Sequence, residues 1–308
     1  MRLATFRHEG RTRTGIVDGD QVRPFEGDPG MLEIIAAGWR SRGTANGVPL
    51  AEVRLLAPLR PGSIRDFVAF EEHVEGVRRS VDGASGVPEA WYAAPTFYFT
   101  NPHTVLGPDD SVPFPAASVA RDFELEVAAV IGPDEKIFGY TILNDWSARD
   151  LQSREMKVGL GPAKGKDFAT TLGPWIVTAD ELDAFRDSDG FLQLWCTAGV
   201  NGVEVGRDLL SNMGWTFETM LAYAARDSRV VAGDVLGSGT VGNGGCLAEL
   251  WGRNGEQDPP PLRDGDVVTL TVEGIGSLTN TVVSRQRGDG LPPVRRRDPA
   301  AARNERQG

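Results

Sequence analysis

The chain has 308 residues, of which 40% are hydrophobic and 24% charged, and its formal net charge is −11 at pH 7. This is the composition of a globular protein long enough for one large domain and a small one, and its negative charge disfavours nucleic-acid phosphates as partners. The two cysteines form no disulfide framework, no apolar run reaches the ~18 residues of a membrane helix, and the N-terminus lacks a signal-peptide core. We therefore expect a soluble, cytoplasmic protein with no membrane partner.

The first predicted elements form a small N-terminal α/β domain over residues 1–57. Strands are predicted at residues 2–7, 14–18 and 51–57, with a turn at Glu9–Gly10 and a helix at residues 31–38 that Gly38 ends. Pro58, Pro61 and Gly62 then interrupt the pattern. Since proline and glycine punctuate local structure, we place a domain boundary there.

Residues 58–285 show mostly short strands separated by Gly and Pro turns. Asn201–Gly202 between two such runs indicates a type I′ hairpin. Helices are predicted only at about residues 147–157 and 214–225, which is too little helix for repeated βαβ units. The predicted fold class is therefore α+β, mostly β, as a mixed β-sandwich or closed roll. The polar, Arg-rich residues 286–308 are predicted to be a disordered tail.

Two carboxylates lie two residues apart in the strand-like stretch FELEVAAV. The two-residue period of a strand puts Glu124 and Glu126 on one face, opposite Phe123 and Leu125. Two neighbouring carboxylates are costly when they are buried without partners, and a divalent cation would remove that cost. Oxygen ligands of this kind suit Mg²⁺, Mn²⁺ or Ca²⁺. The alternative is a strand with a solvated face, where the pair costs almost nothing.

Further polar residues follow the next predicted strand, which runs into Asp145 just before a helix that begins near Ser147. Asp145 could simply cap that helix. Arg149 and Gln152 are three residues apart and share a helical face, so they could clamp a carboxylate. A solvated polar face is the alternative for these two side chains.

One lysine-containing loop and one histidine complete the candidates in this region. The Gly-rich stretch 161–168 has the freedom to bring a lysine to a ligand, although Lys164 is expected to be exposed. His73 lies at a charged helical start beyond an apolar strand and would be a natural general base near neutral pH. His8 and His103 are expected to be structural or exposed.

A second Gly-rich stretch covers residues 231–245. Its glycines allow the backbone to approach a ligand closely, but no Gly-Lys-Ser/Thr follows, so the spacing is not that of a phosphate-binding loop. Glu249 is predicted inside a short strand with apolar neighbours. Its carboxylate is therefore expected to have a partner.

The joint order of these residues is much more specific than any one of them. Over roughly residues 58–283 the chain resembles the fumarylacetoacetate hydrolase family. The resemblance is carried by His73, Glu124-x-Glu126, Asp145-Trp-Ser-Ala-Arg149-Asp-x-Gln152, Gly-Lys166-x-Phe and Gly-Asp-x-x-x-x-Gly-Thr240. The stretch DWSARDxQ with the following GKxF is its most specific part.

The resemblance implies a mixed β-sandwich roll behind a small N-terminal domain, usually assembled as a homodimer. It also implies roles for individual residues. The metal ligands would be Glu124, Glu126, Asp145 and Asp66. The general base would be His73, oriented by Glu249, and the substrate contacts would be Arg149, Gln152, Lys166 and Thr240. Lys166 would also stabilise the negative charge that develops during the reaction.

We therefore expect a metal-dependent hydrolase that cleaves a carbon–carbon bond in a small oxo-acid, an acylpyruvate or a fumarylacetoacetate-like acid, in aromatic compound catabolism. Mg²⁺ is the expected cofactor, with Mn²⁺ or Ca²⁺ as alternatives. The alternative functions are a decarboxylase or isomerase of oxo- or hydroxydienoic acids, and a non-catalytic metal-stabilised binding protein. The chain has Gly76 where the family's small decarboxylase and acylpyruvase members carry a glutamate. Residues 74–97 are predicted to be a mobile lid that sets specificity.

Overall fold

The computed structural model describes residues 1–37, 43–81 and 85–286, together with residues 288, 290–297, 303 and 306. Its largest element is a 12-stranded sheet in the order β4-β3-β2-β1-β14-β12-β11-β17-β6-β7, with β5 on β1 and β8 on β14. The strands of this sheet are β1 (Arg2–His8), β2 (Arg11–Asp18), β3 (Gln21–Pro24), β4 (Val48–Pro49), β5 (Arg54–Leu55), β6 (Ile64–Phe67), β7 (Phe97–Thr100), β8 (Val105–Leu106), β11 (Leu125–Ile131), β12 (Ile137–Asp145), β14 (Thr170–Thr178) and β17 (Val235–Gly237).

A second sheet has five strands in the order β16-β15-β18-β19-β9, and a short pair is formed by β10 and β13. These strands are β9 (Ser111–Phe114), β10 (Arg121–Asp122), β13 (Ser147–Ala148), β15 (Trp195–Val200), β16 (Val203–Leu209), β18 (Val267–Val272) and β19 (Gly276–Ser284). The helices are α1 (Met31–Ala37), α2 (Glu71–Val81), α3 (Arg149–Met156), α4 (Ala179–Leu182), α5 (Phe217–Ala225) and α6 (Leu247–Asn254), with short 3₁₀ turns that include η1 (Leu50–Glu52) and η2 (Glu89–Ala93).

The larger sheet is buried on both faces. On β11, Leu125 and Val127 pack into the main core together with Leu270 of the second sheet, whereas Ala128 packs on the opposite face with Ile34 of α1. A sheet that is covered on both faces reads as a continuous apolar run, as β11 does after Glu126. This packing of sheet on sheet, with few helices, confirms the α+β, mostly β prediction.

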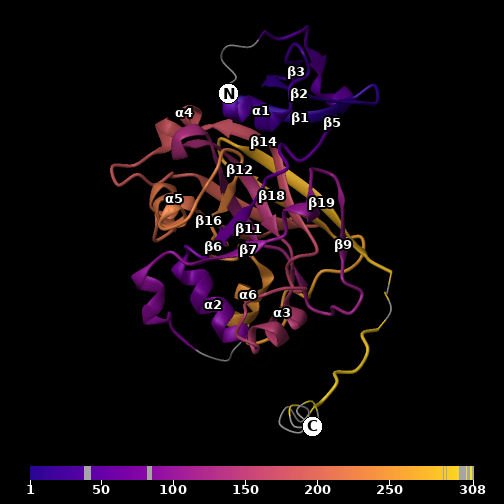
Figure 1. The fold of residues 1–308 in the computed structure, drawn as a ribbon, viewed down its shortest axis with the longest axis vertical. Helices are drawn as coiled ribbons and strands as arrows, with labels where there is room; N and C mark the ends of the chain where they lie inside the picture. The colour runs from indigo at the N-terminus through magenta and orange to yellow at the C-terminus, as the bar shows by residue number, and fades with distance from the viewer. Residues whose placement is uncertain are drawn as a thin grey trace.

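The N-terminal strands continue the same sheet that carries the later strands. Strand β1 pairs antiparallel with β14, with Arg2 opposite Val177. Figure 1 shows β1, β2 and β3 at one end of the molecule and α2, α3 and α6 gathered at the other. The division into domains at residues 57 and 285 stays a prediction. The disorder of residues 286–308 also stays a prediction, because many of these residues lie outside the described part. Gly38, which is predicted to end the first helix, lies outside the described residues too.

Both tight turns that the sequence predicts are present. Asn201 and Gly202 have φ values of 52° and 79° and connect β15 to β16, as a type I′ hairpin requires. Glu9 and Gly10, with φ values of 47° and 77°, connect β1 to β2. These turns are specified locally, because each needs two residues that tolerate a positive φ.

The prediction of a strand around Glu249 is wrong, since these residues form helix α6. The Asp122 carboxylate accepts the backbone N–H groups of Leu247 at 2.8 Å and Ala248 at 3.0 Å, and the Cys246 thiol accepts that of Glu249 at 3.4 Å. These bonds satisfy N–H groups that the first turn of a helix leaves without partners. Asp122 is distant in sequence, so no local pattern indicates this cap.

Several other predicted boundaries shift. Within residues 51–57 only β5 is a strand, because η1 occupies the start of the segment. Helix α3 begins at Arg149 rather than near Ser147, because Ser147 pairs with β10. Asp145 ends strand β12 and caps no helix, and the residue at the N-cap position of α3 makes no side-chain cap bond.

Candidate active site

Three buried carboxylates converge where β6, β11 and β12 lie close together. Asp66, Glu126 and Asp145 each offer one oxygen, and these oxygens all lie within 4.8 Å of one another. Their exposed fractions are 2%, 1% and 0%. The alternative of a solvated strand face is therefore excluded for Glu126, and also for Glu124, which is 4% exposed.

The chain leaves room between two of these carboxylates. Gly237 of β17 lies between β6 and β11, opposite Asp66 on one side. A Cβ atom on Gly237 would lie 2.6 Å from Asp66 Oδ1 and 2.8 Å from Glu126 Oε2. Because Gly237 has no side chain, the Asp66 and Glu126 carboxylates can both occupy the space beside it, which any larger residue would fill.

The carboxylate cluster fits a hard divalent cation. Asp66 Oδ1 and Asp145 Oδ1 are buried and have no hydrogen-bond partner, and Glu126 Oε2 accepts a backbone bond from Gly239 N at 3.1 Å. Burial first, and then the repulsion by Asp145, raise the pKa of Asp66 well above its usual range. Burial and the neighbouring Asp66 likewise raise the pKa of Glu126 well above its usual range. Orphaned oxygen atoms and mutual repulsion are what a divalent ion would relieve.

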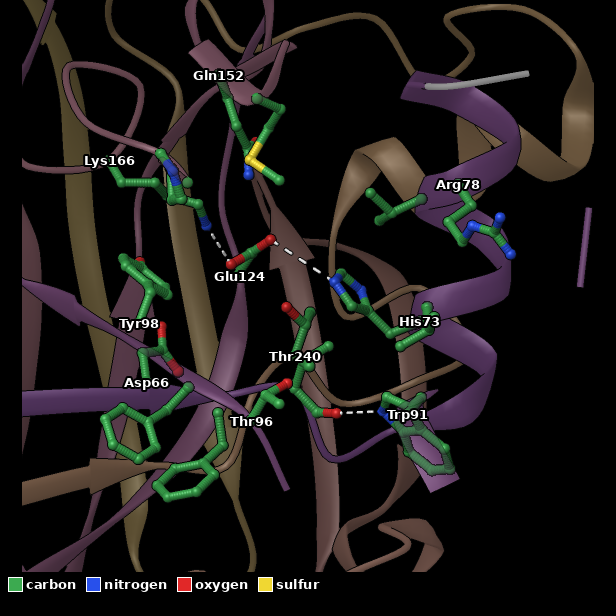
Figure 2. A pocket seen from close by; sticks show the side chains of 18 of the residues that line it. Asp66, His73, Arg78, Trp91, Thr96, Tyr98, Glu124, Gln152, Lys166 and Thr240 are labelled. Atoms are coloured by element: carbon green, nitrogen blue, oxygen red, sulfur yellow. Dashed lines mark hydrogen bonds and ion pairs between the residues drawn. The ribbon is translucent and has the colours of Figure 1, made fainter. Parts of the chain in front are cut away.

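Glu124 lies beside this cluster and is paired with two cations. Lys166 Nζ lies 2.5 Å from Glu124 Oε2 and 2.5 Å from Asp145 Oδ2, and Arg149 Nη2 lies 2.8 Å from Glu124 Oε1. Burial opposes ionisation of Glu124, but Lys166 and Arg149 hold its pKa below the usual range. Figure 2 shows the Lys166 ammonium directed at Glu124. The structure thus brings Lys166 to the acidic cluster, whereas Lys164 is exposed and pairs with Asp167.

His73 lies on α2 and faces Glu124. Its Nε2 atom is 3.9 Å from Glu124 Oε1, and its Nδ1 atom is 3.7 Å from Cys246 Sγ. Burial, only partly offset by Glu124, lowers the pKa of His73 to about 4. The imidazole is therefore neutral at pH 7 and able to accept a proton. His8 is half-buried on β1, and His103 is exposed.

Glu249 packs against α2 but forms no hydrogen bond with His73 in the described structure. Its Oε1 atom accepts from Gly244 N at 3.3 Å and pairs with Arg253, and its buried Oε2 atom has no partner. A Cβ atom on Gly76 would lie 2.5 Å from Glu249 Cγ. The glycine at position 76 therefore makes the room that Glu249 occupies. Burial raises the pKa of Glu249 to about 7.

The remaining predicted side chains line the same cavity, which has a volume of about 540 Å³. Arg149 Nη1 donates to Gln152 Oε1 at 3.2 Å, which confirms that the two residues share a face of α3. Gln152 and Thr240 both line the cavity, together with Lys166, His73 and the carboxylates of Asp66, Glu124 and Glu126. Figure 2 shows Gln152 and Thr240 on opposite sides of Glu124.

Three residues of the site were not found from the sequence. Tyr98 of β7 stands opposite Asp66 in the sheet register and donates to Asp145 Oδ2 at 2.5 Å. Asp122 holds Arg149 with a 2.7 Å ion pair, and Cys246 contacts His73. Tyr98 lies in the run FYFT, which predicts a strand but not the strand with which it pairs. The contacts of Asp122 and Cys246 depend on pairings between distant segments of the chain.

The fold and the site together define a class of enzyme in which a β-rich roll holds a cluster of buried carboxylates beside a lysine and a buried histidine. Residues 63–283 match the family described as Fumarylacetoacetate (FAA) hydrolase C-terminal, and residues 1–58 match the one described as Rv2993c-like, N-terminal. The chain belongs to the fumarylacetoacetate hydrolase family. Members of this family are enzymes, and they include hydrolases and isomerases. This chain is therefore an enzyme.

Individual relatives are similar over most of their length. The fumarylacetoacetase of Oryza sativa subsp. japonica is 30% identical and aligns with 80% of this chain and 72% of its own. Protein Rv2993c of Mycobacterium tuberculosis is 31% identical over 79% of this chain and 83% of its own.

Solved structures agree with the fold. The 5-carboxymethyl-2-hydroxymuconate delta-isomerase of Mycobacterium smegmatis is 28% identical, with a TM-score of 0.68 over 92% of this chain and 100% of that one. The fumarylacetoacetate hydrolase of Exiguobacterium antarcticum is 26% identical, with the same TM-score and coverage. No helix among the described residues is long and apolar enough to span a bilayer.

Proposed function

We propose that this enzyme is a divalent-metal-dependent hydrolase that cleaves a carbon–carbon bond in a small β-diketo acid of the acylpyruvate type. The observation that supports this function best is the convergence of Asp66, Glu126 and Asp145 within 4.8 Å of one another, next to Lys166 and a neutral histidine. A β-diketo acid carries neighbouring oxygens that such a centre can hold, and its cleavage needs a base and a stabilised negative charge.

Asp66, Glu126 and Asp145 would hold the ion, with Glu124 as a further ligand. Mg²⁺ is our first candidate, and Mn²⁺ and Ca²⁺ accept the same oxygen donors. When bound, the ion supplies Lewis-acid polarisation of a substrate carbonyl.

His73 would act on water. Its neutral imidazole takes a proton from the water while the oxygen adds to the acyl carbonyl carbon. The bond from that carbon to the neighbouring methylene carbon then breaks, and the electron pair stays with the pyruvate fragment. The methylene carbon takes the proton back, so the products are a carboxylic acid and pyruvate. Lys166 and Arg149 would stabilise the negative charge on the departing fragment.

Glu249 would help to orient His73 by packing against the helix that carries it. In the structure, Glu249 fills the space beside Gly76, which lies three residues after His73. Gln152 and Thr240 line the cavity and would contact the substrate.

A lyase or isomerase acting on a related oxo-acid is the second candidate, favoured by the 28% identity with the Mycobacterium smegmatis isomerase. Turnover of acylpyruvates in heavy-oxygen water with Mg²⁺ or Mn²⁺ separates the two candidates. Hydrolysis places one solvent oxygen in the carboxylic acid product, as mass spectrometry would show. Release of CO₂, or a product isomer without solvent oxygen, would overturn the hydrolase proposal.

We also infer that the enzyme works in the cytoplasm as a homodimer, in aromatic compound catabolism. These inferences rest on the family to which the chain belongs. Light scattering coupled to size-exclusion chromatography tests the dimer, because a monomer and a dimer of this 33.2 kDa chain differ twofold in mass.

A further inference from the structure

The two ends of the cavity differ in chemistry. The acidic end carries Asp66, Glu124 and Glu126 with Lys166 and Arg149, all of them buried. Most of the remaining lining is an apolar wall that comes from five segments: α2, η2, β7, α3 and the loop after α3. Its main side chains are Val74, Val77, Trp91, Phe97, Met156 and Pro162.

Trp91 is a fixed part of this wall. Its indole Nε1 donates to Val68 O at 2.6 Å, a bond that Figure 2 shows as a dashed line. The ring also lies 6.4 Å from that of Trp215, and a Cβ atom on Gly214 would be 2.8 Å from Trp91 Cη2. A large aromatic side chain held on two sides and by its N–H group presents a rigid apolar face.

The basic residues of the cavity are already engaged. Four of them line it, of which Arg149 and Lys166 pair with carboxylates at the acidic end and His73 faces Glu124. Arg78 donates from Nη1 to the backbone oxygens of Gly86 and Ser85. Figure 2 shows its guanidinium pointing away from Glu124. Arg78 therefore keeps its charge beside the apolar wall, but its hydrogen bonds hold the guanidinium at the backbone of residues 85–86.

Such a wall selects against a charged ligand group. A carboxylate buried beside Val77 and Trp91 would lose its hydration and could gain an ion pair only if Arg78 gave up its backbone hydrogen bonds. An alkyl or aryl group would instead gain apolar contacts there. The length of the cavity beyond the acidic cluster thus suits a ligand with one charged end only.

We propose that the substrate carries an uncharged, apolar alkyl or aryl tail on the acyl side of its oxo-acid head, and that Val77 and Trp91 determine this specificity. This inference rests on the proposed function, because the head is placed at the metal centre of that reaction. It excludes diacids, such as fumarylacetoacetate, as preferred substrates.

The test compares butanoylpyruvate with succinylpyruvate on the full-length protein loaded with Mg²⁺. The two compounds differ only in the tail, where a carboxylate replaces the terminal methyl group. Since apolar pockets discriminate a single methylene by roughly 10–200-fold, we expect kcat/KM to favour butanoylpyruvate by at least ~30-fold. Equal or better cleavage of succinylpyruvate by the unmutated protein would overturn the inference.

A paired substitution locates the specificity. Val77→Arg places a guanidinium in the wall and is expected to reduce the preference at least ~10-fold, by improving succinylpyruvate. Val77→Met adds similar length without charge and is the matched control, for which the preference order is expected to stay. An unchanged preference in folded Val77→Arg would remove Val77 from the proposal.

Calorimetric binding of both compounds separates this inference from the proposed function. Cleavage of both compounds with a preference for succinylpyruvate would keep the hydrolase and overturn the apolar tail. Tighter binding of butanoylpyruvate without any cleavage would overturn the hydrolase and keep the tail specificity. Absence of binding by either compound in the presence of Mg²⁺ or Mn²⁺ would overturn both.

Discussion

The Lys166 ammonium bridges Asp145 and Glu124, with Nζ 2.5 Å from an oxygen of each. Burial lowers the pKa of Lys166, but Asp145 and Glu124 outweigh it and keep the pKa above the usual range. This cation therefore holds together two acidic residues that would otherwise repel each other inside the protein.

Lys166→Met should destabilise the metal-free protein by roughly 3–5 kcal/mol, because removing one partner of a buried ion pair leaves uncompensated charge. Urea unfolding measures the free energy, and added Mg²⁺ should restore part of it by binding the freed carboxylates. Lys164→Met is the matched control, since Lys164 is exposed and its pair with Asp167 is expected to contribute about 0–1 kcal/mol. Equal effects of the two substitutions would contradict this account.

His73→Gln should lower kcat by roughly 10²–10⁴-fold, the usual contribution of a general base, while Mg²⁺ affinity stays close to that of the unmutated protein. Steady-state kinetics and calorimetry measure the two quantities separately. His103→Gln is the control: His103 is exposed, so this substitution should change neither kcat nor the Mg²⁺ affinity. Full turnover by folded His73→Gln would remove this residue from the reaction.

Gly237→Ala should abolish tight metal binding. The new methyl group would lie 2.6 Å from Asp66 Oδ1 and 2.8 Å from Glu126 Oε2, so the two carboxylates could not keep their positions. Gly30→Ala is the control, since a Cβ atom there meets nothing within 4 Å. Calorimetric titration with Mn²⁺ measures the loss, and an isotherm unchanged by Gly237→Ala would speak against a metal between Asp66 and Glu126.

Glu126→Gln should weaken Mg²⁺ binding strongly, and binding to the unmutated protein should release protons. Burial and repulsion raise the pKa of Glu126, and a metal ligand must be deprotonated, so affinity should rise with pH. Calorimetry in buffers of different ionisation enthalpy counts the protons released. Glu204→Gln, at an exposed residue of β16, serves as control. Binding without proton release would show that the carboxylates are already ionised.

Glu249→Gln should stabilise the protein increasingly as pH rises from about 4.5 to about 7. The pKa of Glu249 rises on folding from 4.5 to about 7 because of burial. In this range the folded protein binds more protons than the unfolded one, so stability falls as pH rises and Glu249 ionises. The full effect amounts to about 3 kcal/mol.

Thermal unfolding of Glu249→Gln and the unmutated protein at pH 5 and pH 8 measures this difference. Glu204→Gln is again the control, and its effect is expected to stay within about 0.5 kcal/mol at both pH values. A Tm difference for Glu249→Gln that is the same at both pH values would refute the prediction.

The sequence by itself determined the family, the fold class and most of the residues at the site. Glu124 and Glu126 both line the cavity, as the period of two predicts, although β11 begins only at Leu125. Arg149 reaches Gln152 because helical spacing is local too. The two turns at Glu9–Gly10 and Asn201–Gly202 follow for the same reason.

The tertiary structure alone decided what these side chains meet. It separated Glu124, paired with two cations, from Glu126, which joins Asp66 and Asp145. It also turned the predicted strand around Glu249 into a helix. Each outcome depends on strands or helix ends brought together from distant parts of the chain. Periodicity gives the face on which a side chain lies, but not the register and packing that choose its neighbour.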